Sequence, residues 1–169
     1  MIIDLNSFER ESTANVAIPA SEIDLEIENA RIADDVVFQG AITKGSAVTA
    51  VKGEIKGVIE LDCDRCLEPV RTPLNIEVDL EFVPEEQFSV ENEKELNAED
   101  LKVDAVTADS LDLKDIVREQ ILLEIPQQFF CKDDCKGLCQ KCGANLNLID
   151  CNCIETEIDP RWAALQNLN

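Results

Sequence analysis

Histidine is absent from this 169-residue chain, and basic residues are scarce, with 15 Lys and Arg against 36 Asp and Glu. The chain therefore lacks the commonest general base and the usual ligand of a catalytic zinc-bound water. The acidic residues are too numerous for one pair to stand out as an acid and a base. We therefore expect a protein that is not an enzyme.

The formal charge of −21 also bears on binding partners. A phosphate backbone must be met by Lys and Arg, so the charge disfavours binding to naked RNA. The chain has eight cysteines, and if all of them held two zinc ions as thiolates, the charge would become about −25. A basic protein, or a cationic patch in an assembly, is the partner that such a surface attracts, although acidity also serves solubility.

Long apolar runs are missing as well. No stretch approaches the length of a membrane span, and the first ten residues are too acidic for a secretory signal. The glycines of residues 45–57 lack the G-x-x-x-x-G-K-[ST] pattern, so neither a phosphate loop nor a small-molecule substrate is expected. Gly45 is interpreted as a turn residue, and Gly53 and Gly57 as bulge or twist positions. We expect a soluble, cytoplasmic protein whose cysteines bind metal in preference to forming disulfides.

Apolar residues alternate with polar ones in several segments, which is the pattern of strands with one buried face. The first 20 residues carry few periodic signals, although Ile2, Ile3 and Leu5 could start an edge strand. Short connections favour antiparallel pairing. The predicted strands cover residues 23–28, 36–43, 48–61 and 74–82.

A helical stripe of apolar residues follows over residues 111–125. Asp109 or Ser110 can cap this helix, and Pro126 stops it. Residues 84–104 are acidic and read as a solvated loop. The predicted fold is α+β, with an antiparallel sheet or partial barrel covered by one main helix in residues 1–128. Residues 129–169 are expected to form a cysteine-rich zinc-binding module that ends in a short helix.

Eight cysteines form four close pairs. Cys139-Gln-Lys-Cys142-Gly has the form of a zinc knuckle, in which glycine lets the backbone turn sharply so that amides can point at sulfur. The C-D-R-C segment lies between two predicted strands, where a hairpin tip would aim two thiolates at one point. The predicted zinc ligands form two groups: Cys139, Cys142, Cys151 and Cys153, and Cys63, Cys66, Cys131 and Cys135. Cys131 and Cys135 could instead exchange with another pair.

The cysteines could also serve functions other than zinc binding. Cys135, Cys139 and Cys142 have the spacing of a radical-SAM cluster triplet, but the helix–strand alternation of a barrel is absent. Cys63 and Cys66 do not begin a helix that would lower a thiol pKa, which argues against a thioredoxin-like role. An iron–sulfur or thiol redox protein remains the alternative function. A carboxylate-based nuclease would need flanking basic residues that are not apparent.

Four segments occur in order along the chain: C-D-R-C-L-E-P-V, then C-K-D-D-C-K-G-L-C-Q-K-C-G-A-N-L-N and C-N-C, then I-D-P-R-W-A-A-L. With these motifs, the sequence resembles the YceD family over most of its length. Members are called large ribosomal RNA subunit accumulation proteins, so the resemblance implies a role in the accumulation of that RNA. Family genes often neighbour the gene of a zinc-ribbon protein of the large subunit, which suggests a partner. The family supplies no catalytic residue.

Charge and resemblance together predict a non-catalytic factor in ribosome biogenesis. Its acidic face would hold a basic ribosomal protein or a precursor of the large subunit. Any contact with ribosomal RNA would be local, near the metal module. Trp162 would pack on that module or anchor a partner. The basic residues expected to make such contacts are Lys132, Lys136, Lys141 and Arg161.

Overall fold

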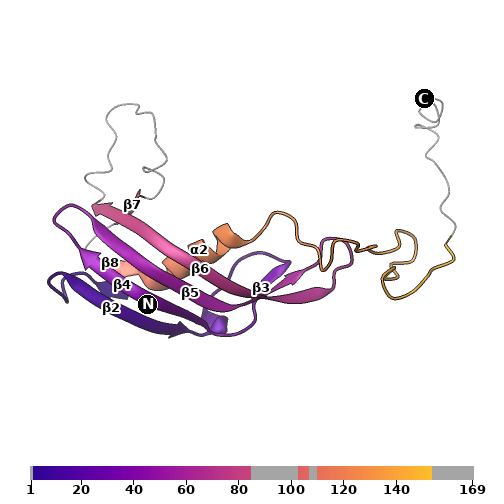
Figure 1. Ribbon diagram of the computed structural model, residues 1–169, viewed down its shortest axis with the longest axis horizontal. Coiled ribbons are helices and arrows are strands. Elements are labelled where there is room, and N and C mark those ends of the chain that lie inside the picture. The colour runs from indigo at the N-terminus through magenta and orange to yellow at the C-terminus, as the bar shows by residue number, and fades with distance from the viewer. Residues whose placement is uncertain (1, 85–102, 107–109, 154–169) are drawn as a thin grey trace, which may run out of the picture. The chain divides into compact units, whose positions relative to one another are not determined.

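The computed structural model describes residues 2–84, 103–106 and 110–153 (Figure 1). The chain divides into two compact units. The first comprises Met1–Asp62 and Pro69–Phe129, and the second comprises Cys63–Glu68 and Phe130–Asn169. In the part of the chain that the structure describes, no helix is long and apolar enough to cross a membrane.

A twisted six-stranded sheet forms most of the first unit (Figure 1). Its strands run in the order β2-β4-β5-β6-β7, and β3 pairs with β5 outside this path. All pairings are antiparallel except that of β6 with β7, which is parallel. The strands are β2 (Glu11–Ile18), β3 (Ala30–Ile32), β4 (Val36–Lys44), β5 (Thr49–Asp62), β6 (Pro69–Pro84) and β7 (Val103–Val106).

A second, two-stranded sheet pairs β1 (Ile2–Asp4) with β8 (Ser110–Asp112), and α2 (Leu113–Glu124) follows directly. The Asp112 side chain accepts a hydrogen bond from the Lys114 amide at 2.9 Å and caps the helix. The helix is therefore confirmed, but its cap is Asp112 and not Asp109 or Ser110. A short 3-10 turn, η1 (Ala20–Glu22), follows β2.

The hydrophobic core lies between the sheet and the apolar face of α2. Phe38 and Ile55 of the sheet and Val117 and Ile121 of the helix are fully buried in one cluster. Each such side chain contributes about 1.5–3 kcal/mol by leaving water. Alternate residues along β6 face outward, and those in its C-terminal half are acidic: Glu77, Asp79 and Glu81. The predicted strands at residues 36–43, 48–61 and 74–82 and the covering helix are therefore confirmed, in a fold that is mostly β.

The predicted strand at residues 23–28 is wrong. Ile23 and Leu25 are buried, as the alternation requires, but the segment forms no ladder with any strand among the described residues. The Asp24 side chain accepts a hydrogen bond from the Glu26 amide at 2.9 Å, and Glu26 has a φ of 56°. Arg118 of α2 donates to the Asp24 carbonyl and pairs with Glu26 at 2.7 Å. The Arg118 side chain thus donates to a backbone carbonyl that would accept from a neighbouring strand if this segment were part of a sheet.

Three further features differ from the sequence-based expectations. β2 carries mostly small and polar residues, so its alternation is weak and the strand is not predicted. β7 is parallel to β6, so the sheet is not wholly antiparallel. The register across β4, β5 and β6 is continuous, so neither Gly53 nor Gly57 is a bulge. The predicted loop at residues 84–104 lies mostly outside the described residues, and the predicted terminal helix lies wholly outside them.

Candidate metal centres

The loop that joins β5 to β6 is a tight hairpin tip. The Cys63 amide donates to the Glu68 carbonyl at 3.0 Å, and the Leu67 amide donates to the Cys63 carbonyl at 2.8 Å. Leu67 adopts a φ of 58°, a left-handed conformation in which glycine is usual. The turn directs the side chains of Cys63 and Cys66 inward, and both are buried. The predicted hairpin position of this pair is confirmed.

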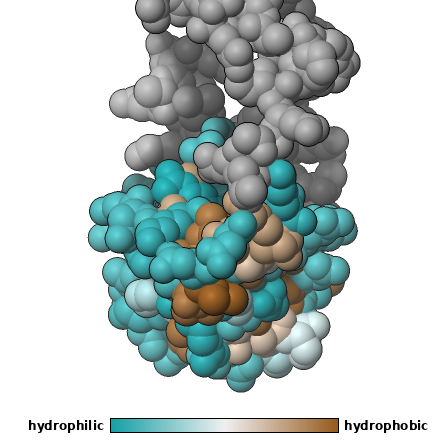
Figure 2. Space-filling model, turned by 90° about the vertical axis from the view of Figure 1, so that its right-hand side faces the viewer, coloured by the Kyte–Doolittle hydropathy of each residue, from teal (hydrophilic) through white to brown (hydrophobic). Residues whose placement is uncertain are grey.

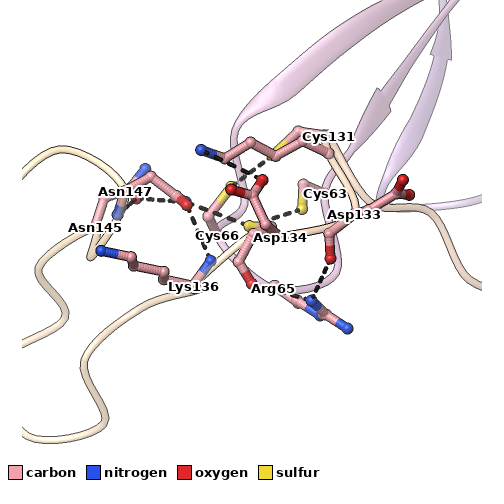
Figure 3. A network of polar contacts seen from close by, with 11 residues as sticks. Cys63, Arg65, Cys66, Cys131, Asp133, Asp134, Lys136, Asn145 and Asn147 are labelled. Atoms are coloured by element: carbon pink, nitrogen blue, oxygen red, sulfur yellow. Dashed lines mark hydrogen bonds and ion pairs between the residues drawn. The ribbon is translucent and has the colours of Figure 1, made fainter.

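The first thiol group gathers this pair with two cysteines from the segment after α2 (Figure 3). The Sγ atoms of Cys63 and Cys135 are 3.8 Å apart, and those of Cys66 and Cys131 are 3.6 Å apart. All four sulfur atoms lie within 4.8 Å of one another. The two segments are far apart in sequence, so tertiary folding alone brings these sulfurs together.

Arg65 connects the hairpin tip to the segment that carries Cys131 and Cys135. Its guanidinium donates to the carbonyl of Asp133 at 3.3 Å and to that of Cys135 at 3.0 Å. It also lies 4.2 Å from the centre of the Phe130 ring, within the range of a cation–π interaction. Phe130 and Leu138 pack against the buried cysteines. The first group is therefore held by contacts on several sides.

The second thiol group is formed by Cys139, Cys142, Cys151 and Cys153, whose sulfur atoms also lie within 4.8 Å of one another. Its cysteine residues are less buried than those of the first group. Gly143 has a φ of 72°, and its amide donates to the Cys139 carbonyl at 2.8 Å. The sharp turn that the knuckle pattern predicts at this glycine is confirmed.

Thiol acidity in the first group is uneven. Burial opposes ionisation of Cys63, but hydrogen bonds from backbone amides, that of Cys131 foremost, outweigh it and lower its pKa to about 6. Burial raises the pKa of the Cys131 thiol to about 12, and the neighbouring Cys135 sulfur adds to the effect. Burial also raises the pKa of Cys66. Burial also opposes ionisation of Cys135, but hydrogen bonds, that from Asn147 foremost, lower its pKa. The thiolates that form readily in this group oppose the ionisation of Cys66 and Cys131.

The second group behaves in the same way. Hydrogen bonds from the backbone amides of Cys142 and Lys141 lower the pKa of Cys139 to about 6. Hydrogen bonds with the Cys142 and Cys139 sulfurs raise the pKa of Cys153 to about 12. A divalent cation would supply the positive charge that lets all four thiols of a group ionise.

The first group fits a single tetrahedral metal ion, and the second offers the same set of four sulfurs within 4.8 Å of one another. A bond of about 2.3 Å from metal to sulfur places tetrahedral sulfurs roughly 3.8 Å apart. The two separations in the first group, 3.6 and 3.8 Å, match this spacing. A four-iron cluster binds each cysteine through a different iron atom and needs wider sulfur spacing. Four sulfur ligands leave no open coordination position, so a zinc ion held in this way would be structural.

The structure brings the cysteines together in the two groups of four that the spacing predicts, and metal binding itself stays a prediction. Lys132, Lys136 and Lys141 are exposed in the second unit, and Lys132 lies 3.8 Å from Asp134. Arg161 and Trp162 lie outside the described residues. Partner contacts by these five residues likewise stay predictions.

Sequence reasoning gave no role to the two asparagines of G-A-N-L-N. Asn147 donates a hydrogen bond from Nδ2 to the Cys135 sulfur at 3.3 Å. Asn145 donates from Nδ2 to the Glu68 carboxylate at 3.2 Å. Asparagine is common in turns, so the type of residue gave no sign of a contact with a distant cysteine.

This chain is similar in sequence to several known proteins. An uncharacterized protein of Mycobacterium bovis is 29% identical over 144 residues, which cover 85% of this chain and 59% of that protein. The uncharacterized protein YlbN of Bacillus subtilis is 33% identical over 115 residues, covering 68% of this chain and 62% of that protein. The chain spans about three fifths of the length of these relatives.

A plant protein carries a descriptive name. The large ribosomal RNA subunit accumulation protein YCED homolog 1, chloroplastic, of Arabidopsis thaliana is 31% identical over 137 residues, covering 69% of this chain and 43% of that protein. No solved structure gives a significant match. The family model described as "Large ribosomal RNA subunit accumulation protein YceD" matches residues 51–169. The match covers most of the chain, including both cysteine groups, and the chain therefore belongs to the YceD family.

Proposed function

We propose that this protein is a non-catalytic factor that supports the accumulation of large-subunit ribosomal RNA and the assembly of the large ribosomal subunit. The observation that carries the proposal is membership of a family described by that role. A plant relative bears the same description in its name. The proposed mode of action is binding of a basic ribosomal protein, or of a precursor complex, to the acidic surface of this chain.

Charge pairing on the first unit supports an acidic binding surface. Several basic side chains there are already paired with carboxylates: Arg31, Lys52, Lys56, Arg71 and Arg118. Their charge is therefore largely compensated, and the excess of Asp and Glu remains for a partner. Figure 2 shows mostly hydrophilic residues on the face that it draws, with a smaller hydrophobic group among them.

The outward face of β6 is the part of this surface that we assign to the partner. Glu77, Asp79 and Glu81 are exposed and lie on one side of the strand, where Lys52 of β5 pairs with Asp79 at 3.0 Å. Glu77 stands directly opposite Glu54 in the ladder, and the ion pair of Glu54 with Lys56 only partly offsets the repulsion between these like charges. A cationic partner would offset the rest. Association would be steered by charge and would weaken as salt increases.

We assign zinc to both cysteine groups as a structural ion. The sulfur-only ligand set and the sulfur spacing favour one tetrahedral ion in each group. Any RNA contact would come from Lys132, Lys136, Lys141 and Arg161, with Trp162 as an anchor. The competing function, an iron–sulfur or thiol redox protein, predicts a coloured protein with visible charge-transfer bands.

The direct test is a native pull-down from lysate of the host, with and without a chelator. Recovery of large-subunit precursors or of a basic ribosomal protein supports the proposal. Tight binding of purified protein to naked large-subunit RNA, with a steep dependence on salt, would contradict the proposed protein partner. Depletion of the protein should lower large-subunit ribosomal RNA relative to small-subunit RNA, and an unchanged ratio would contradict the proposed role.

Two charge-reversal variants locate the binding surface. Glu77→Lys, Asp79→Lys and Glu81→Lys together reverse the charge of the assigned face of β6. The control reverses three exposed acidic residues elsewhere in the first unit: Glu9, Glu11 and Glu22. Both variants have the same net charge, so a loss of the partner only in the first supports the assigned face. Equal losses would mean that net charge alone attracts the partner.

A further inference from the structure

Asn147 connects the two cysteine groups. It lies on the loop between Cys142 and Cys151, which are both members of the second group. Its side chain nevertheless points at the first group, where Nδ2 lies 3.3 Å from the sulfur of Cys135 (Figure 3). A loop that begins and ends at one candidate metal centre thus supplies a hydrogen-bond donor to the other.

Both ends of the Asn147 amide are used. Its Oδ1 accepts a hydrogen bond from the Lys136 amide at 2.9 Å, and Lys136 directly follows Cys135. Because a backbone N–H can only donate, the oxygen must face Lys136, and the NH₂ group is left to face the sulfur. The side chain therefore fixes both the Cys135 sulfur and the backbone that follows it.

Asn145 holds Asn147 in this orientation. Its Oδ1 accepts hydrogen bonds from the backbone amide of Asn147 at 3.0 Å and from the Asn147 Nδ2 at 2.9 Å. Its own Nδ2 donates to Glu68 of the hairpin tip at 3.2 Å. The loop is also joined to the segment after Cys135, because the Leu146 amide donates to the Gly137 carbonyl at 2.9 Å. The N-L-N segment therefore connects the second group's loop to both segments that supply the first group.

An N–H donor to a ligand sulfur stabilises the thiolate over the thiol and fixes the direction of the sulfur lone pairs. Loss of such an outer partner typically lowers metal affinity about 10- to 100-fold. The donor acts only if its loop is ordered. The knuckle and the pair Cys151 and Cys153 close that loop, and a metal bound to them would restrict it.

We propose that Asn147 is a positioning residue for metal binding by Cys63, Cys66, Cys131 and Cys135, and that it couples this group to the second one. Metal binding at the second group orders the loop that presents Asn147 to Cys135, so the two groups bind metal with positive cooperativity. By linkage, metal at the first group strengthens binding at the second to the same extent. The proposal rests on the metal-binding part of the proposed function and is independent of the ribosomal partner.

The first experiment titrates the full metal-free chain with Zn²⁺ in competition with a chromogenic chelator. Asn147→Asp keeps the size of the side chain but replaces the donor with an anionic oxygen that faces sulfur. The matched control is Asn75→Asp, which makes the same chemical change at an exposed position of β6, away from both cysteine groups. We expect Asn147→Asp to weaken one of two bound ions at least about tenfold, and Asn75→Asp to leave that ion within about twofold. Equal effects of the two substitutions would overturn the proposal.

A double-mutant cycle tests the coupling. Cys139→Ser with Cys142→Ser disables the second group and leaves one binding group in the chain. We expect the affinity of the first group to fall about 5- to 150-fold, the usual range of coupling between sites. In an Asn147→Ala background, the same serine substitutions should cause little further loss. The coupling would be overturned if the serine substitutions left the metal affinity of the first group unchanged. It would also be overturned if they lowered that affinity by the same factor with and without Asn147→Ala.

Two further measurements distinguish a chain without coupling between the groups from a chain that does not bind metal. The visible spectrum of the Co²⁺-loaded chain reports thiolate ligation directly, and far-ultraviolet circular dichroism reports whether the sheet of each variant is folded. A wild-type chain that binds two ions independently would overturn the coupling alone. A chain that binds no metal at either group would overturn both the coupling and the assigned zinc sites, while leaving the ribosomal role to its own tests.

Discussion

Gly40 of β4 and Gly53 of β5 are paired directly across the sheet, and their backbones approach so closely that neither position has room for a side chain. A Cβ atom added to Gly40 would lie 2.8 Å from the Gly53 Cα, and one added to Gly53 would lie 2.7 Å from the Gly40 Cα. The Cβ atom on Gly40 would also lie 2.8 Å from the ring of Phe38. Both glycines are therefore required by a close approach of two strands.

Replacing either glycine should destabilise the first unit. Gly40→Ala or Gly53→Ala forces the backbone of two central strands apart, which should cost about 2–3 kcal/mol. The control is Gly57→Ala, whose Cβ atom would lie 3.1 Å from Cγ2 of Val36 and no closer than 3.6 Å to its backbone. Urea denaturation should show a much smaller loss for the control. Equal losses at Gly53 and Gly57 would contradict the close-approach explanation.

Leu67 should be under backbone strain. Its φ of 58° costs a leucine about 1–2 kcal/mol relative to glycine, and its side chain is 63% exposed, so replacement loses little burial. Leu67→Gly should therefore raise the denaturation midpoint of the zinc-loaded chain. The relief of backbone strain should exceed the stability that is lost because glycine makes the unfolded chain more flexible. Leu67→Val, which is β-branched, should lower the midpoint. A lower midpoint for the glycine variant would indicate that Leu67 makes a stabilising contact.

Elemental analysis should find two zinc ions in each chain. Cys139→Ser with Cys142→Ser should reduce this to one ion, as should Cys63→Ser with Cys66→Ser. Removal of metal from the wild type should destabilise the second unit, because ligand binding and folding share one free energy. Iron in place of zinc, or a brown purified protein, would contradict the zinc assignment and favour the redox alternative.

Metal affinity should rise with pH. At neutral pH, Cys63 and Cys139 are thiolates in the metal-free protein, because their pKa values are about 6. Each group also has two thiols with pKa values raised above 9.0, which keep their protons: Cys66 and Cys131, and Cys151 and Cys153. Metal must displace at least these two protons from each group.

This proton release determines the direction in which metal affinity changes with pH. Acid favours the metal-free form, so affinity should fall at least about 100-fold for each pH unit lost between about pH 9 and pH 7. Below about pH 6 the fall should steepen, because Cys63 and Cys139 then also take up protons. Calorimetric titrations in buffers of different ionisation enthalpy count the protons released. A count below two per ion would contradict the stated thiol acidities.

Local patterns predicted the parts of this protein that local forces decide. Alternation along β6 identified its buried face because side chains on a strand point to opposite sides with a period of two residues. The pattern Cys139-x2-Cys142-Gly predicted the turn at Gly143 for a similar reason, since one residue with positive φ closes that loop. The same kind of reasoning failed at residues 23–28, where Arg118 takes the carbonyl of Asp24.

The sequence by itself determined the cysteine pairs, the main strands and the helix, because each depends on residues within a few positions of one another. Only the tertiary structure decided that Asn147 contacts Cys135 and that Glu68 contacts Asn145. These hydrogen bonds join segments whose separation in the chain carries no periodic signal. They form because the hairpin tip and the segments that carry the two cysteine groups pack together, and such packing depends on the whole fold.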